Sequence, residues 1–112
     1  MSNPEELEQI DVHKAKALIE GGKVQTVDIR DAMAFHEAHI SHAISVSDNN
    51  VEDFMASADK EKPLICYCYH GISSQGAAQY FKEHGFKEVY SIIGGFEEFQ
   101  KSYPALIQPA RG

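Results

Sequence analysis

Apolar and polar positions along this chain follow two different periods, which predict helices and strands that alternate along the sequence. Residues 12–20 carry apolar side chains at helical spacing, with Asp11 before them as an N-cap and Gly21 and Gly22 after them as a stop. Residues 24–29 instead form an almost continuous apolar run, which is typical of a strand covered on both faces. These segments predict one helix and one buried strand.

The same two patterns predict the remaining elements. The expected strands are residues 8–10, 24–29, 43–46, 63–68 and 89–92, and the expected helices are residues 12–20, 32–37, 51–58, 74–84 and 96–102. Asp31, and either Asn49 or Asn50, are expected to cap the second and third helices. Alternating strands and helices with short links favour an α/β fold with parallel strands and helices on both sheet faces. Residues 1–7 and 105–112 are expected to be loose ends.

Composition narrows the class of protein. Residues 1–112 suit a single domain with one core, and 43% hydrophobic with 24% charged residues is ordinary for a soluble globular protein. The formal net charge is −7 and Lys and Arg form no cluster, which argues against nucleic acid and an anionic membrane as partners. The acidic start of the chain does not resemble a signal peptide, and no run is apolar and long enough to span a bilayer.

Two cysteines, Cys66 and Cys68, stand in the strand predicted at residues 63–68. A disulfide between cysteines so close in sequence could not stabilise a small secreted fold, so we expect free thiols in a reducing cytoplasm. Cys68 is at the carboxyl end of the strand, where parallel α/β sheets bind their ligands. Cys68 is therefore the candidate reactive residue.

The loop after Cys68 has the composition of an anion-binding turn. Gly71 tolerates positive φ, which lets the backbone curl so that successive N–H groups point at one anion. Ser73 and Ser74 can cap the following helix and offer hydroxyl donors. The N-terminus of a helix carries partial positive charge, which lowers the pKa of a nearby cysteine. The pattern fits a nucleophilic thiolate, and equally an ordinary buried cysteine before a strand-to-helix turn.

Three stretches of the sequence resemble signatures of the rhodanese family. Residues 68–74, Cys-Tyr-His-Gly-Ile-Ser-Ser, with the helix after them, resemble its active-site loop, closest to the short single-domain thiosulfate sulfurtransferases of the GlpE type. Residues 27–43, which begin Val-Asp-Ile-Arg-Asp, resemble the N-terminal signature of the family. Residues 89–99, Val-Tyr-Ser-Ile-Ile-Gly-Gly-Phe-Glu-Glu-Phe, resemble its C-terminal signature.

The resemblance implies a rhodanese-like three-layer sandwich, in which a five-stranded parallel sheet is flanked by helices. It implies a double displacement, in which the Cys68 thiolate takes the outer sulfur of thiosulfate and releases sulfite. The resulting persulfide gives its sulfur to cyanide or to a dithiol such as reduced thioredoxin. No metal or cofactor is implied. The residues expected to bind substrate are those of the loop: Tyr69, His70, Gly71, Ile72, Ser73 and Ser74.

Four residues near the predicted site allow more than one interpretation. Asp28 either helps to hold the loop, as the resemblance to the family implies, or is an N-cap or a partner for Arg30. Arg30 fits a structural ion pair better than a substrate ligand. Cys66 is expected to be a small core residue rather than a resolving thiol. His70 is open to a general-base role, although a double displacement needs no base once the thiolate exists.

Other kinds of site fit the sequence less well. Two groups of residues could suggest a metal, namely Cys66, Cys68 and His70, and the histidines at 36, 39 and 42. Both lack the spacing of a zinc site, so no metal is expected. A cysteine phosphatase needs an Arg six residues after its nucleophile, where Ser74 stands. Non-catalytic binding modules of this fold often lack the cysteine that is present here. Many relatives carry Arg or Lys at residues 72–75, where this chain has Ile-Ser-Ser-Gln.

Overall fold

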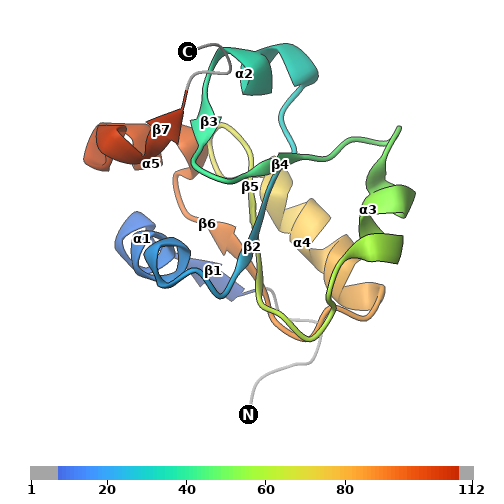
Figure 1. Ribbon diagram of the computed structural model, residues 1–112. Coiled ribbons are helices and arrows are strands. Elements are labelled where there is room, and N and C mark those ends of the chain that lie inside the picture. Colours follow the sequence, from blue (N-terminus) through green and yellow to red (C-terminus); the bar gives the residue numbers. More distant parts are fainter. Residues whose placement is uncertain (1–7, 109–112) are drawn as a thin grey trace.

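A computed structural model describes residues 8–108 of the chain. Its centre is a parallel sheet in the order β1-β6-β5-β2-β4 (Figure 1). The strands are β1 (Glu8–Ile10), β2 (Gln25–Asp28), β4 (Ile44–Ser45), β5 (Leu64–Tyr67) and β6 (Val89–Ile92). The five-stranded parallel sheet expected from the sequence is confirmed, and β5 is its middle strand.

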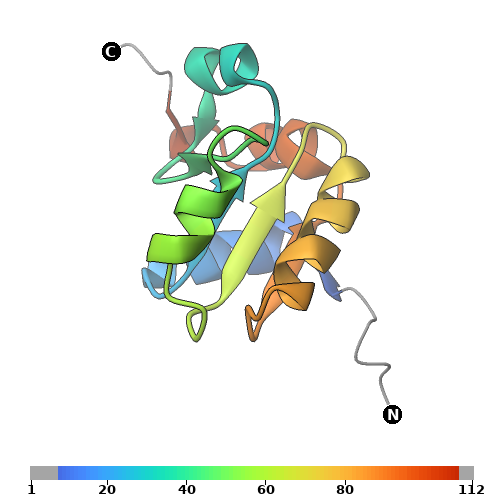
Figure 2. The same cartoon turned by 90° about the vertical axis from the view of Figure 1, so that its right-hand side faces the viewer.

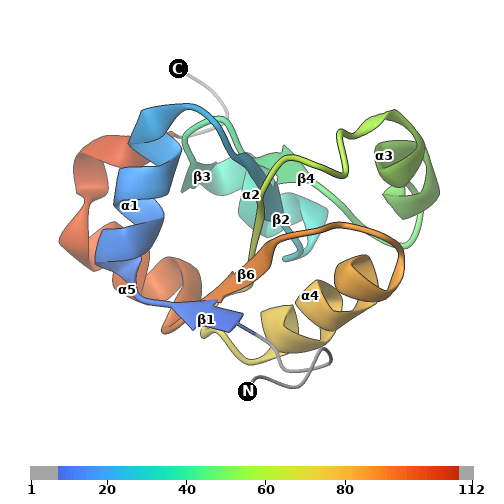
Figure 3. The same ribbon diagram turned by 90° about the horizontal axis from the view of Figure 1, so that it is seen from below.

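Helices cover both faces of this sheet, as Figures 1 and 3 show. Figure 2 looks onto the face that carries α3 and α4, with α1 on the far side. One face bears α1 (Val12–Gly21) and α5 (Gly95–Ser102), the other bears α3 (Val51–Ser57) and α4 (Ser73–Glu83), and the short α2 (Ala32–Glu37) follows β2. The predicted three-layer α/β sandwich is therefore confirmed.

Alternate residues of β5 enter two separate hydrophobic cores. Ile65 and Tyr67 pack on the side of α1 and α5, whereas Leu64 and Cys66 pack on the side of α3 and α4. All four are fully buried, and each large apolar side chain contributes about 1.5–3 kcal/mol through its burial. Because residues i and i+2 of a strand share a face, Cys68 emerges on the α4 side of the sheet.

Two of the three predicted N-caps are confirmed. Asp11 and Asp31 each accept a hydrogen bond from the amide three residues later, at 2.8 Å. Asn50 takes the N-cap position of α3, but its side chain accepts from the Ser47 N–H and donates to the Ser45 carbonyl instead. The expectation of a side-chain cap there is wrong, because Asn50 closes the preceding turn.

The expectation that residues 105–112 are loose is wrong for residues 105–108. A 3₁₀ turn at Pro104–Leu106 leads into β7 (Ile107–Gln108), which pairs antiparallel with β3 (His39–Ile40). Ile107 packs against the core beside α1 and α5, and the Leu106 carbonyl accepts from Ser41 at 2.8 Å. Residues 1–7 and 109–112 lie outside the described residues. No helix in the described range has the length and apolar character to cross a membrane.

Candidate active site

Cys68 stands directly after β5, at the carboxyl end of the middle strand. The loop of residues 69–72 follows it, and α4 begins at Ser73. Only 7% of Cys68 is exposed, so its thiol meets solvent over a small area. This position, at the edge where parallel sheets bind ligands, is the one expected from the sequence.

Amide groups of the loop surround the sulfur of Cys68. The Gly71 and Ser74 N–H groups each donate to Sγ at 3.2 Å, and the Ser74 Oγ lies 3.4 Å from it. Burial by itself raises the pKa of the Cys68 thiol, but the Ser74 hydroxyl and the amides of Ser74, Gly71 and His70 outweigh it. The pKa therefore lies below its ordinary value. Donors that converge on sulfur favour the thiolate without a metal or a cationic side chain.

The loop keeps this curl because α5 holds its other side. The Cys68 carbonyl accepts from the Phe96 N–H at 2.8 Å, and the Tyr69 carbonyl accepts from the Glu97 N–H at 3.0 Å. Both amides belong to the first turn of α5, which has no earlier carbonyls to bind. The loop thus points its N–H groups inward at Sγ and its first carbonyls outward at a second helix.

Two glycines make this close approach possible. A Cβ on Gly95 would lie 2.5 Å from the Cys68 carbonyl oxygen, and one on Gly71 would lie 2.7 Å from the Ile92 carbonyl oxygen. Both residues have positive φ, at +61° and +89°. The sequence predicts the curl at Gly71, whereas Gly95 stands out only as part of the stretch that resembles the C-terminal signature. Its role beside Cys68 depends on a contact between segments far apart in the chain.

Neither serine of the loop caps α4, contrary to the expectation. The N-cap is Ile72 and makes no side-chain cap. The Ser74 hydroxyl is fully buried, because it turns inward toward Cys68 and lies 2.7 Å from the hydroxyl of Ser91 in β6. The Gln75 side chain supports the turn instead, by donating to the Gly71 carbonyl at 3.0 Å. Ser91 and Gln75 are two contributors that the sequence pattern did not single out.

The remaining loop residues face outward around the buried sulfur. Tyr69 is 43% exposed and Ile72 is 73% exposed, and Ser73 is also exposed. The His70 ring directs Nδ1 at the Glu97 carboxylate, 3.0 Å away, on the solvent side of α5. The Cys68 thiolate thus opens onto a rim made of an aromatic ring, an aliphatic side chain and a hydroxyl.

Asp28 and Arg30 form a buried ion pair beneath the loop. The Arg30 Nη2 lies 2.6 Å from Asp28 Oδ2, and Asp28 has no exposed surface. The same Nη2 donates to the Ala38 carbonyl at 2.6 Å, and the Arg30 amide donates to the Asp28 carboxylate at 2.8 Å. The guanidinium is therefore occupied by protein partners.

Cys66 lies deeper on the same side of the sheet. It is fully buried in the core of α3 and α4, and this burial raises the pKa of its thiol above the ordinary value. Both cysteines are free thiols. Two thiols whose pKa values are shifted in opposite directions thus stand two residues apart, because only Cys68 accepts hydrogen bonds from the loop amides that lower its pKa.

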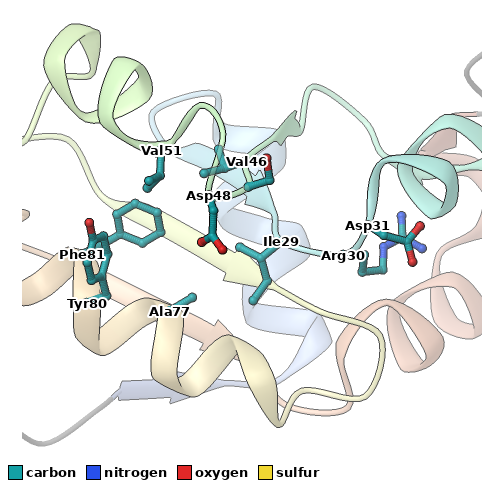
Figure 4. Close-up of a pocket in the computed structure, with 10 residues that line it drawn as sticks. Ile29, Arg30, Asp31, Val46, Asp48, Val51, Ala77, Tyr80 and Phe81 are labelled. Atoms are coloured by element: carbon teal, nitrogen blue, oxygen red, sulfur yellow. The ribbon is translucent and has the colours of Figure 1, made fainter.

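A groove of about 530 Å³ runs beside the active-site loop, between α4 and the ends of β2 and β4 (Figure 4). Ala77 lines it one turn beyond Ser74, and Ile29 lines it directly after β2, the strand next to β5. In Figure 4 the Asp48 carboxylate points into the middle of the groove. The groove is mainly apolar and is connected to the loop through α4, whose residue Ala77 lies one turn after Ser74.

Metal-ligating side chains do not gather around this site. Among residues 8–108, no three or more His, Cys, Asp or Glu side chains are placed to share one ion. The chemistry of the site is therefore derived from the thiol, the loop amides and the two buried serine hydroxyls.

Comparisons with known proteins agree with this geometry. Residues 11–102 match the rhodanese-like domain. The thiosulfate sulfurtransferase GlpE of Coxiella burnetii (strain RSA 331 / Henzerling II) is 45% identical over 86% of this chain and 90% of its own length. That of Pseudomonas savastanoi pv. phaseolicola (strain 1448A / Race 6) is 46% identical over 88% and 92%. The solution structure of a rhodanese-like domain from Anabaena sp. superposes with a TM-score of 0.79 at 22% identity, over 92% of this chain and 80% of that one. The chain therefore belongs to the rhodanese family, as a single-domain member of the GlpE type.

Proposed function

We propose that this protein is a thiosulfate sulfurtransferase that carries sulfur as a persulfide on Cys68. The observation that supports this most directly is the set of donors around Sγ, with the Gly71 and Ser74 amides at 3.2 Å. They lower the pKa of the Cys68 thiol and so favour the thiolate, which is the form that attacks sulfur. The GlpE relatives at 45% and 46% identity are named for the same activity.

The first half of the reaction loads the enzyme with sulfur. The Cys68 thiolate attacks the outer sulfur of thiosulfate, a new S–S bond forms, and the old S–S bond breaks. Sulfite leaves with the electron pair of the broken bond. The negative charge then lies on the terminal sulfur of the persulfide, beyond Sγ. Loop amides of residues 70–74 and the Ser74 hydroxyl are suited to stabilise the thiolate and the charge that develops around it.

The second half returns the enzyme to its starting state. The carbon of cyanide, or the sulfur of an acceptor thiolate, attacks the terminal sulfur, and the Cys68 thiolate leaves. With cyanide the product is thiocyanate. With a dithiol the acceptor first becomes a persulfide, and its second thiol then displaces hydrosulfide to form a disulfide. A covalent intermediate between two separate halves predicts ping-pong kinetics.

The rim residues and the ion pair have distinct proposed roles. The exposed Tyr69, Ile72 and Ser73 bind the incoming substrate, together with the His70 side of the loop. Asp28 and Arg30 support the loop from below, because their pair is buried and hydrogen-bonded within the protein. The groove lined by Ile29 and Ala77 gives a protein thiol acceptor an apolar surface beside Cys68, which a small ion such as cyanide does not need.

The free thiols fit a reducing compartment such as the cytoplasm. Both cysteines are unpaired, and the proposed cycle requires Cys68 to return to a thiolate after each transfer. A dithiol acceptor of the thioredoxin kind would be available there in its reduced form.

The test is direct loading of the enzyme with sulfur. Incubation with thiosulfate should add the mass of one sulfur atom, and addition of cyanide should remove it with release of thiocyanate. Cys68→Ser should neither gain the mass nor release thiocyanate. Cys66→Ser, the matched control two residues away, should keep most of the activity because that thiol is fully buried. A folded Cys66→Ser that loses activity, beside an active Cys68→Ser, would reverse the assignment.

An aryl phosphate assay separates this proposal from a phosphatase. The position six residues after Cys68 holds Ser74, whose hydroxyl is buried, and not the arginine that would clamp a phosphate. Hydrolysis of an aryl phosphate should therefore not depend on Cys68. A rate that Cys68→Ser abolishes would contradict the sulfurtransferase assignment.

A further inference from the structure

Ser91 is a buried polar residue that the proposed cycle has not yet used. It lies in β6, has no exposed surface, and stands beside Cys66 in the register of the sheet. Its Oγ lies 2.7 Å from the Oγ of Ser74, and the Ser74 Oγ lies 3.4 Å from the sulfur of Cys68. Two buried hydroxyls and the reactive sulfur therefore form one row.

When the sulfur is charged, only one arrangement of protons forms both hydrogen bonds of this row. Each hydroxyl has a single proton, and a thiolate has none to give. In that arrangement the Ser74 hydroxyl donates to Sγ, and its oxygen accepts from Ser91. The charge on sulfur thus orders both hydroxyls, with Ser91 donating to Ser74 and Ser74 donating to Cys68.

Without a partner behind it, the Ser74 hydroxyl would have other choices. Serines in the first turn of a helix commonly turn their hydroxyl toward backbone carbonyls of the preceding turn. The Gly71 carbonyl already accepts from the Gln75 side chain, but it retains a second lone pair. A donor at Ser91 makes the inward orientation of Ser74 the favoured one. It also polarises the Ser74 O–H, which strengthens the bond to sulfur.

We infer that Ser91 is a positioning residue for the nucleophile, which acts through Ser74 by holding the hydroxyl proton of Ser74 toward the Cys68 sulfur. This role rests on the proposed function, since it concerns the thiolate that begins the cycle. It places part of the active site on β6, the strand beside β5. The alternative is that Ser91 merely satisfies a buried hydroxyl and leaves the thiolate unaffected.

The test is the pH dependence of Cys68 alkylation by iodoacetamide, with the modified peptide identified by mass spectrometry. The variants are Ser91→Ala and Ser91→Thr. Thr26→Val is the matched control, because Thr26 is 5% exposed in β2 and lines a groove on the α1 side of the sheet with Ile19. Thermal unfolding of each variant is recorded in parallel, so that an effect of stability is seen separately.

In Ser91→Ala the midpoint of the alkylation profile should move to higher pH. At a pH below the wild-type midpoint, the rate should fall about 3–10-fold, which corresponds to roughly half to one pH unit. Ser91→Thr keeps the hydroxyl and should restore the wild-type midpoint. Thr26→Val should leave the midpoint unchanged even where it lowers the unfolding temperature.

A double-mutant cycle tests whether the effect of Ser91→Ala passes through Ser74, and Ser74→Ala alone, which should raise the midpoint too, carries the test where Ser91→Ala folds poorly. In a Ser74→Ala background the hydroxyl that Ser91 orients is gone, so adding Ser91→Ala should move the midpoint no further. An equal shift in both backgrounds, or no shift in either, overturns the role of Ser91. An ordinary cysteine midpoint in the wild type would instead contradict the proposed thiolate, which is a separate outcome.

Discussion

The guanidinium carbon of Arg30 lies 4.0 Å from the centre of the Phe96 ring. Phe96 is also the residue whose amide binds the Cys68 carbonyl, at 2.8 Å. Arg30 is fixed from the other side by Asp28, to which it donates from both Nε and Nη2. One cation–π contact therefore connects a buried ion pair after β2 to the turn of α5 that holds the active-site loop.

Replacement of Arg30 by Leu should destabilise the protein strongly. It removes the cation that pairs with the fully buried Asp28 carboxylate, and a buried charge left without its partner costs about 3–5 kcal/mol. Urea unfolding measures the loss, and Asp28→Asn in the same chain should restore part of it. Lys16→Leu is the control, because its pair with Glu20 is exposed to solvent and contributes little to stability. A similar small loss for both variants would show that Asp28 is solvated or neutral.

Gly95→Ala should displace the active-site loop. The new Cβ would lie 2.5–2.6 Å from the Cys68 and Tyr69 carbonyl oxygens and the Gly71 nitrogen, and positive φ costs a non-glycine residue about 1–2 kcal/mol. A shift of the loop by about 1 Å can lower turnover on the order of 100-fold. The rate of thiocyanate release by the folded variant measures this loss of turnover.

Gly76→Ala is the matched control for that substitution. Gly76 lies in α4 with no neighbouring atom within 4 Å of an added Cβ, so the alanine should stabilise the helix by about 0.5–1 kcal/mol. Its activity should stay near that of the wild type. Full activity in Gly95→Ala would mean that the loop tolerates movement at the carbonyls of residues 68 and 69.

The layered fold could be predicted because each element carries its own local signal. Asp11 and Asp31 mark helix starts, and the uninterrupted apolar residues of β5 mark a strand buried on both faces. The position of Cys68 follows from the same pattern, since a loop after a central parallel strand meets the edge where ligands bind. The family resemblance then indicated which chemistry to expect there.

Contacts between distant segments could not be predicted in the same way. Ser91 meets Ser74 only because β6 lies beside β5, and nothing in its own neighbourhood distinguishes it from other strand serines. The local preference of serine predicts that Ser74 caps its helix. Its side chain is instead fully buried and faces the sulfur of Cys68. Residues 107 and 108 have a weak strand pattern by themselves, and their pairing with β3 decides their structure.

Ala77→Phe should lower the activity with a protein thiol acceptor more than the activity with cyanide. The larger side chain would fill part of the groove beside Cys68, which a protein acceptor is proposed to use and cyanide is not. With reduced thioredoxin as the probe, kcat/KM should fall about 10-fold or more, in line with about 1.4 kcal/mol of lost binding. With cyanide it should change little. Gln79→Phe, on the same helix but outside the groove lining, is the control. If Ala77→Phe lowers kcat/KM equally for both acceptors, the groove is excluded as a docking surface.

Ile72→Arg should improve binding of thiosulfate. Ile72 is 73% exposed on the rim of the loop, so the substitution places a cation near the anionic substrate without burying it. A charge about 8 Å from a dianion in water contributes roughly 1 kcal/mol, which lowers KM for thiosulfate about 3–5-fold at low salt. Since the Debye length is about 8 Å at physiological ionic strength, the gain should shrink as salt is added. Ile72→Gln, which is polar but neutral, should show no such salt-dependent gain. If KM for thiosulfate does not respond to the arginine even at low salt, the anion approaches Cys68 from another side of the rim, away from Ile72.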